Sequence, residues 1–227
     1  MDAVSTVQSH RDSHKLLSIV LALLAVCALW FIRKNLLHYF IDYSPASYTA
    51  YLWPRRGALI PHALGGLLAI TTGLVQIWLG LTHRVGRLHR TLGKVYCAGV
   101  LVASLAGYYL VITIPSKYLV YGTGLFALCT AWIVTTSMAV IAIRNRQFEQ
   151  HREWMLRSYT VTFAFATFRL LEHWLIDHHV ASPDDVDAIL AWACWSVPLL
   201  LLEPLIQLQK LHRRGHKAQP REGWATD

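Results

Sequence analysis

Six apolar runs, separated by short polar segments, organise this chain of 227 residues. Each run is close to the ~20 mostly apolar residues that a helix needs to cross the hydrocarbon of a bilayer. Open sheets leave backbone groups without partners in lipid, and the runs are too long for barrel strands. The pattern therefore predicts an all-α integral membrane bundle of six transmembrane helices, at residues 16–32, 58–81, 95–114, 118–143, 158–176 and 188–208.

The composition agrees with a membrane protein, because only 15% of the residues are charged, against about 25% in soluble domains. The first run does not resemble a cleaved signal peptide, since bulky and basic residues occupy 30–34, where a small-residue cleavage site would be needed. We therefore predict one transmembrane domain, 16–208, between a polar N-terminal tail, 1–15, and a basic C-terminal tail, 209–227.

Lysine and arginine are distributed unevenly among the predicted connections. The segments 82–94 and 144–157 each carry four of them, whereas 177–187 carries none and holds four aspartates. The positive-inside rule therefore places both termini in the cytoplasm. The net charge of +8 follows from this topology, so the expected partner is the lipid bilayer, including anionic lipids, and no nucleic acid. Four bases in 33–57, a connection rich in aromatic residues that we expect along the outer interface, are the exception.

Two basic cassettes, "RLHRTLGKVY" at 87–96 and "EQHREWMLRSY" at 149–159, precede apolar runs on the cytoplasmic side. In each, a His-Arg pair is followed by another base and then by a tyrosine. The positive-inside rule accounts for the bases but not for His89 and His151. The two cassettes predict two hairpins that turn on the same side, with these two histidines facing each other in an inner-side site.

A second pair of histidines, His62 and His173, falls at the outer ends of the second and fifth spans. Bis-histidine ligation from facing helices is how membrane proteins hold haem b, which makes both pairs candidate haem-iron ligands. Arginines suit the haem propionates, and the predicted cofactor-binding set also includes Arg90, Arg152, Arg157, Arg169, Gln76 and Tyr96. His151 and His173 would lie about 33 Å apart on one helix, which argues against two closely coupled haems. Interfacial histidines at helix ends are the alternative.

Small and polar residues form one face of the second span. They recur every three or four positions, which aligns them on one side of a helix: His62, Gly66, Ala69, Gly73, Gln76, Gly80 and His83. One interpretation is close helix packing, with Gln76 hydrogen-bonded across the interface. The other is space for a flat cofactor or a polar cavity.

Charged residues inside the spans are candidates for function, since each is costly in lipid. Arg169 is expected to pair with Glu172 on the same helix or to snorkel to the interface. Glu203 lies towards the cytoplasmic side, where Lys94 and Arg157 are its candidate partners. No catalytic residue is predicted, because the chain has no Gly-rich phosphate loop, no metalloprotease motif and no CxxC pair among its four cysteines.

The segments "HALGGLLAITTGLVQIW", "RLHRTLGKVY" and "HREWMLRSYTVTFAFATFRL" resemble a family of uncharacterised bacterial multi-pass membrane proteins with HxxxG, HRxxGxxY and HRxWMxR motifs. The resemblance covers about residues 58–176 and implies a place in the bacterial cytoplasmic (inner) membrane, but no activity. It puts these residues at motif positions: His62, Gly66, Gln76, His89, Arg90, Gly93, Tyr96, His151, Arg152, Trp154, Met155, Arg157 and Arg169. A looser similarity to transmembrane b-type cytochromes depends on histidine placement and helix count.

These observations lead to one hypothesis and two rivals. The hypothesis is a bis-histidine haem-b protein for electron transfer, working with a redox partner or as a membrane homo-oligomer. The first rival is a cofactor-free transporter with a polar intramembrane site around Arg169 and Gln76. The second is a scaffold, which needs the Gly66, Gly73 and Gly80 face but not the histidines.

Overall fold

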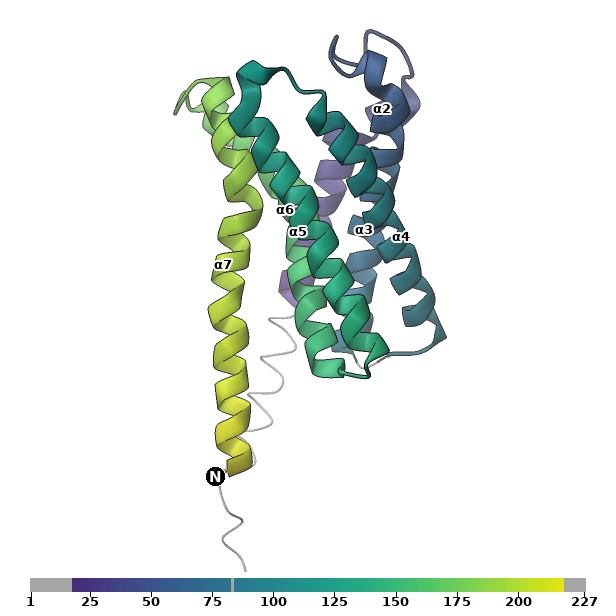
Figure 1. The fold of residues 1–227 in the computed structure, drawn as a ribbon, viewed down its shortest axis with the longest axis vertical. Helices are drawn as coiled ribbons and strands as arrows, with labels where there is room; N and C mark the ends of the chain where they lie inside the picture. The colour runs from purple at the N-terminus through teal and green to yellow at the C-terminus, as the bar shows by residue number, and fades with distance from the viewer. Residues whose placement is uncertain (1–17, 83, 219–227) are drawn as a thin grey trace, which may run out of the picture.

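The computed structural model describes residues 18–82 and 84–218, with side chains described as far as Leu211, and the regular elements in these ranges are all helical, as predicted. Figure 1 shows the bundle. Its elements are the first helix (Ser18–Leu36, ending in the π-helical turn η1, Ile32–Leu36), α2 (His38–Ile41), η2 (Trp53–Arg55), α3 (Arg56–Leu81), α4 (Arg87–Ile112), η3 (Ser116–Tyr118), α5 (Leu119–Arg144), α6 (Phe148–Asp177) and α7 (Pro183–Ala218).

Five helical segments in the described part of the chain are long and apolar enough to cross a membrane. They are the first helix, α4, α7, and the helices α3 and α5 with the short η2 and η3 turns that lead into them. The sixth, α6, has 30 residues and is about 45 Å long at 1.5 Å per residue. It runs the length of the bundle behind α5 in Figure 1 and packs against both α5 and α7. Its charged residues, and not its length, keep its mean hydropathy low.

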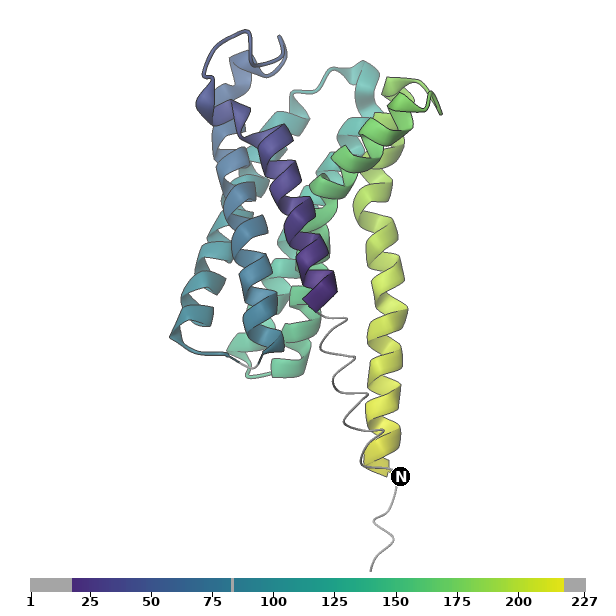
Figure 2. The same cartoon turned by 180° about the vertical axis from the view of Figure 1, so that it is seen from behind.

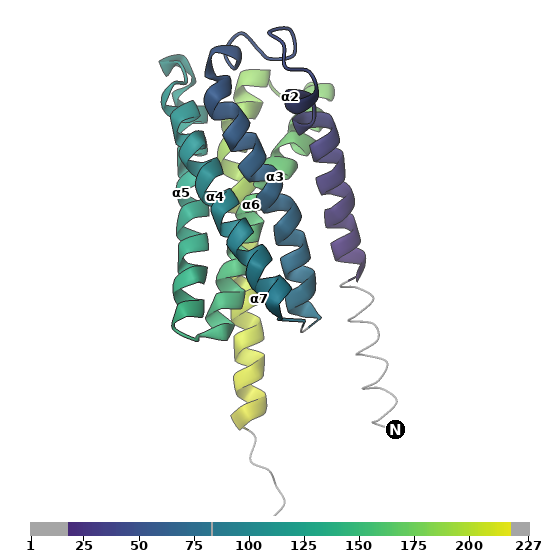
Figure 3. The same ribbon diagram turned by 90° about the vertical axis from the view of Figure 1, so that its right-hand side faces the viewer.

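The helices form two antiparallel hairpins, α3–α4 and α5–α6, which pack against each other, and α7 lies along α5 and α6. Figure 2 shows that the described ends of the first helix and of α7 point the same way. We use "inner" for this end of the bundle, following the predicted topology. Figure 3 shows the first helix at the edge of the bundle, where Ala28 packs on Ile70 of α3 and Ala166 of α6.

The helices extend beyond several of the predicted spans. The span predicted at 95–114 belongs to a helix that begins at Arg87, and the span at 158–176 to one that begins at Phe148. Helix α7 continues to Ala218, so part of the segment predicted as a tail is helical. Hydropathy locates only the part of a helix that lies in hydrocarbon, and polar helical turns beyond it are invisible to this measure. Both cassettes are therefore the first turns of helices.

The connection between the first helix and α3 folds on itself at the outer end. Tyr48 is buried at the centre of a group of rings with Tyr39, Tyr43 and Trp53. Arg55 donates from Nε to Thr113 Oγ1 (2.9 Å) at the end of α4, and the Arg56 guanidinium stacks on Trp53. Two of the four bases that departed from the positive-inside rule are thus fixed by structural contacts.

Close contact between α3 and α4 depends on two glycines. A Cβ atom on Gly65 would lie 2.6 Å from the main-chain oxygen of Gly99, and one on Gly99 would lie 2.8 Å from that of Gly65. Neither contact can be relieved by a side-chain rotation, because both involve backbone atoms. The two backbones therefore approach as closely as small residues allow in membrane helix pairs.

A chain of buried hydroxyl groups joins α4, α5 and α6 at the middle of the bundle. Tyr96 Oη lies 2.7 Å from both Ser158 Oγ and Thr162 Oγ1, and Thr136 Oγ1 lies 2.7 Å from Ser158 Oγ. Trp132 Nε1 donates to Thr162 Oγ1 (2.8 Å), which itself donates to the main-chain oxygen of Ser158. These bonds fix one direction: Thr136 donates to Ser158, Ser158 to Tyr96, and Tyr96 to Thr162.

Adjacent glycines in α3 test the packing of this helix. We expect Gly65→Ala to lower the free energy of unfolding by about 1–3 kcal/mol, because its new methyl group would meet the α4 backbone. Gly66→Ala should be neutral or stabilising by up to ~1 kcal/mol, since no atom lies within 4 Å of its Cβ position. Thermal unfolding in detergent compares the two, and equal stability would contradict the described crossing.

The hydroxyl chain gives a second prediction. Tyr96→Phe removes the acceptor of Ser158 and a donor to Thr162, so it should destabilise the protein by about 1–2 kcal/mol. Tyr109→Phe is the matched control, because Tyr109 lies on the same helix and is exposed. A loss of stability in the control as large as that in Tyr96→Phe would show that the buried network contributes nothing specific.

Candidate functional site

His89 and His151 lie at the same, inner end of the bundle. His89 is in the first turn of α4 and His151 in the first turn of α6. The two imidazoles are close enough for the charge of one to act on the other. That the two rings face each other stays a prediction of the repeated cassette.

A neighbouring helix holds each of the two histidines, His151 through its ring and His89 through its backbone. His151 Nδ1 donates to the main-chain oxygen of Ala139 in α5 (2.9 Å), which leaves Nε2 as the nitrogen with a free lone pair. Gln76 Nε2 of α3 donates to the main-chain oxygen of His89, so Gln76 positions this turn of α4. His89 Nδ1 is buried and has no hydrogen-bond partner among the described residues.

The tyrosines of the two cassettes both enter the core, and each crosses to a different helix. Tyr96 reaches from α4 to α6 in the hydroxyl chain. Tyr159 reaches from α6 to α3, where its hydroxyl donates to the main-chain oxygen of Ile70 (3.1 Å) and its ring covers Gly73. The cassette therefore places a histidine at the inner end and a tyrosine in the packed centre of each hairpin.

The outer histidines do not meet. His62 Nδ1 donates to the main-chain oxygen of Ala103 in α4 (2.8 Å), and its ring packs edge-on against Phe165 at 5.9 Å. His173 is exposed, packs against Trp30 of the first helix at 6.0 Å, and donates to the main-chain oxygen of Arg169. Phe165 is eight residues before His173 on α6, or about 12 Å. Matched depth, on which the predicted pair depended, does not fix the direction in which a ring points.

The small-residue face of α3 is divided among several environments. Gly73 is covered by the Tyr159 ring and Gln76 lies against Gly93, whereas no atom lies within 4 Å of the Cβ positions of Gly66 and Gly80. His83 lies outside the described residues. The face is therefore partly filled by protein side chains, which supports the packing interpretation at Gly73 and Gln76. The closest backbone contact is at Gly65, which lies outside the predicted set.

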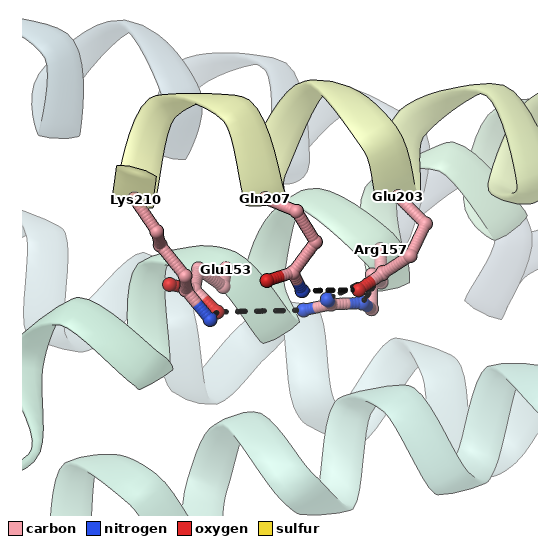
Figure 4. Close-up of polar contacts among 5 residues, drawn as sticks. All are labelled: Glu153, Arg157, Glu203, Gln207 and Lys210. Carbon is pink, nitrogen blue, oxygen red and sulfur yellow. Dashed lines mark hydrogen bonds and ion pairs between the residues drawn. The ribbon is translucent and has the colours of Figure 1, made fainter. Parts of the chain in front are cut away.

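Arg157 pairs with Glu203, one of the two partnerships predicted for that carboxylate. Figure 4 shows the group, in which α6 and α7 face each other through charged and amide side chains. Arg157 donates to Glu203 Oε2 from Nε (3.1 Å) and Nη2 (2.6 Å), and Gln207 donates to Glu203 Oε1 (2.7 Å). Lys210 Nζ lies 2.7 Å from Glu153 Oε2. The Arg157 guanidinium is thus bound to Glu203 of α7 and is not available to a group at the inner histidines.

Arg90 and Arg152 are exposed at the inner end, each next to one of the paired histidines. They are the predicted arginines that remain available to an anionic group there. In the described part of the chain, no three metal-binding side chains of His, Cys, Asp or Glu gather around one point. The inner end therefore offers two imidazoles and two flanking guanidinium groups.

Arg169 pairs with Glu172 on its own helix, as predicted. Its Nη1 lies 3.0 Å from Glu172 Oε1 and 2.7 Å from Oε2. Sequence reasoning missed Asp187 and Tyr121, which also approach this ion pair. Asp187 was assigned to an acidic connection, and the signal that it belongs to a helix was the "SPDD" sequence: Ser182 caps α7 and Pro183 is its first residue.

His38 and Tyr39, from the connection between the first helix and α3, lie within range of the Arg169 charge. Burial and the nearby Arg169 charge lower the pKa of His38, so this imidazole is neutral at pH 7. Burial raises the pKa of Tyr39. Arg169 and Gln76, which one rival hypothesis places in a single polar site, therefore have different neighbours at opposite ends of the bundle.

The α6–α7 ion pair gives a prediction of its own. Glu203→Gln should lower the free energy of unfolding by about 1 kcal/mol, because it removes the carboxylate from an Arg157 side chain that is only 13% exposed. Gln209→Ala, on an exposed position of α7, is the control. Thermal unfolding in detergent measures both, and an unchanged midpoint for Glu203→Gln would show that the pair does not stabilise α7.

The comparisons with known proteins agree with this architecture. Residues 59–207 match the family described as "Predicted membrane protein (DUF2306)", which excludes the first helix and includes both cassettes. No curated protein and no solved structure matches the chain. The match covers about two thirds of the 227 residues and reaches from α3 into α7. The chain therefore belongs to the DUF2306 family, a family of multi-pass membrane proteins of unknown function.

Proposed function

We propose that this protein is a redox protein of the bacterial cytoplasmic membrane that binds one haem b at the inner end, with His89 and His151 as its axial ligands. The observation that carries the proposal is that these histidines, which come from two different hairpins and from the same position of a repeated cassette, lie within range of each other's charge. The positive-inside rule accounts for the basic residues of the two cassettes but not for their histidines.

The hydrogen bonds around the two rings support this assignment. A ligand histidine typically donates its second ring nitrogen to a carbonyl or carboxylate, which fixes its orientation. His151 has this arrangement through Ala139, so its Nε2 would face the iron. His89 Nδ1 is buried without a partner among the described residues, and such a group in a native structure calls for an explanation. A bound cofactor beside this ring would supply one.

The surrounding residues have defined roles in this proposal. Arg90 and Arg152 would pair with the propionates, for which bidentate guanidinium groups are well suited. Gln76 would hold the His89 turn in place through the backbone. Haem, when bound, supplies one-electron chemistry whose potential depends on its axial ligands and surroundings. The chain's own contribution is ligation, orientation and a site at the inner surface, accessible to a redox partner there.

A single haem fits the structure better than two. The outer histidines have different neighbours, and His151 and His173 remain 22 positions apart on the uninterrupted helix α6, or about 33 Å. A bis-histidine site is supported only at the inner end. The proposed function is therefore electron exchange on the cytoplasmic side and not electron transfer across the bilayer.

Absorption spectra test the proposal. Protein purified from cells supplied with ample haem should show a Soret band that shifts on dithionite reduction. His89→Ala and His151→Ala should each lose most of the bound haem, because one axial ligand is removed. His178→Ala, at an exposed position of the outer end, should retain it. A wild-type protein without a Soret band, or a band that survives both inner substitutions, would overturn the proposal.

A cofactor-free transporter is the second candidate, and the partly buried Arg169–Glu172 ion pair favours it. Such a transporter would use the outer ion pair as its polar site, without Gln76. Arg169→Gln should then abolish solute flux in proteoliposomes while the inner histidines remain dispensable. Unchanged flux in Arg169→Gln would contradict this candidate.

A further inference from the structure

An apolar groove lies between the first helix and the inner half of α3. Figure 3 shows the first helix beside α3 at the edge of the bundle, where Ala28 packs on Ile70. The groove lies further inward along both helices, about 10 Å from this contact at 1.5 Å per residue. It has a volume of about 320 Å³, and its walls are Leu21, Ala22, Leu74, Val75 and Trp78.

The groove is open towards the side of the bundle. Ala22 is exposed, and Val75 and Trp78 are 39% and 42% exposed. Both helices are long and apolar enough to cross a membrane, so the groove faces the hydrocarbon of the bilayer. An acyl chain that lies in it contacts two helices instead of one, and thereby makes more dispersion contacts than a chain on a single helix surface.

A basic residue lies at the inner rim of this groove. Arg84 comes three positions after the end of α3, and its guanidinium carbon lies 5.4 Å from the centre of the Trp78 ring. The Arg84 side chain is exposed, and the ion pairs formed among the described residues do not include it. A tryptophan beside a base is typical of the level at which lipid headgroups lie. The guanidinium group is therefore available to a phosphate there.

We propose that this groove binds one anionic phospholipid of the inner leaflet, with an acyl chain between the first helix and α3 and the phosphate on Arg84. The rim favours an anionic lipid, because a zwitterionic headgroup brings a positive charge of its own towards the guanidinium. The apolar walls place the chain, and the single base places the headgroup. One wall comes from the first helix, which lies outside the family match at 59–207.

A lipid in this position attaches the inner half of the first helix to the bundle. The core contacts of this helix lie further out, where Ala28 packs on α3 and α6 with Cys27, Phe31 and Ile32 around it. The bound acyl chain fills the part of the interface that the protein side chains leave open. The inner half of the first helix is thus held through the lipid.

Native mass spectrometry of the full-length protein in detergent tests the proposal, with phosphatidylglycerol and phosphatidylethanolamine of identical acyl chains as probes. The wild type should retain one phosphatidylglycerol about fivefold more tightly than phosphatidylethanolamine, the effect of one base near the headgroups. Arg84→Gln should weaken phosphatidylglycerol binding about fivefold, to the level of phosphatidylethanolamine. Ala22→Trp should abolish this binding, because the indole occupies the groove. Elution as a single peak on gel filtration verifies that each variant is folded.

Two matched variants serve as controls. Arg144→Gln removes an exposed arginine at the inner end of α5, away from the groove walls. Leu23→Trp adds the same indole at the neighbouring position of the first helix, which is 64% exposed and does not line the groove. Both controls should retain phosphatidylglycerol as the wild type does.

The outcomes distinguish a lipid site from a surface that any lipid covers. Equal retention of the two lipids by the wild type would overturn the proposal, as would tight phosphatidylglycerol binding that persists in either Arg84→Gln or Ala22→Trp. An equal loss in the controls would also overturn it, because the lipid would then lie elsewhere. A loss confined to Arg84→Gln and Ala22→Trp supports it. The measurement does not depend on haem, so it stands or fails separately from the proposed function.

Discussion

Helix α6 imposes the main constraint on this bundle, because it carries polar side chains at every depth and lipid offers no partner to any of them. Unpaired polar groups in hydrocarbon are costly enough to decide which helices lie together. At the inner end Arg157 needs α7, where Glu203 accepts two hydrogen bonds. In the middle Ser158 and Thr162 need α4 and α5. The position of α6 between these helices follows from these requirements.

The polar groups of α6 nevertheless do not form a continuous path. Thr162 ends the central hydroxyl chain, and Arg169 lies seven positions further on, about 10 Å along the helix. The intervening residues include Ala166 and Phe168, both fully or almost fully buried. The described core is therefore apolar between the central and the outer polar groups. Two separate sites are consequently a better description of this bundle than one channel through it.

The sequence predicted the features that depend on the chain's own pattern. The number and order of helices follow from apolar runs, and the position of His89 and His151 at one end of the bundle follows from a repeated cassette on hairpins that turn at the same end. The Arg157–Glu203 and Arg169–Glu172 pairs follow from depth and spacing. Each of these predictions requires only a residue's position along its helix and the side of the membrane on which the helix ends.

Features that depend on rotation about a helix axis could not be predicted in this way. The face of α3 was assigned by spacing alone, but the backbone contact with α4 is at Gly65, next to the predicted Gly66. His62 and His173 have similar depths, yet His62 points to Phe165 and His173 to Trp30. Asp187 was missed because a helix start beside a charged segment gives no hydropathy signal, although its capping sequence was readable.

His151 and the Arg169–Glu172 ion pair occupy opposite ends of one uninterrupted helix, and this limits how they can influence each other. Coupling between distant sites requires an element with two arrangements that both sites favour differently. Helix α6 is fixed at its centre by a hydroxyl chain in which each buried group has one direction of donation, so a shift of the whole helix would break several bonds together. A smaller movement of α7 would break fewer, because the ion pairs that join α7 to α6 lie at the inner end, between Arg157 and Glu203 and between Lys210 and Glu153.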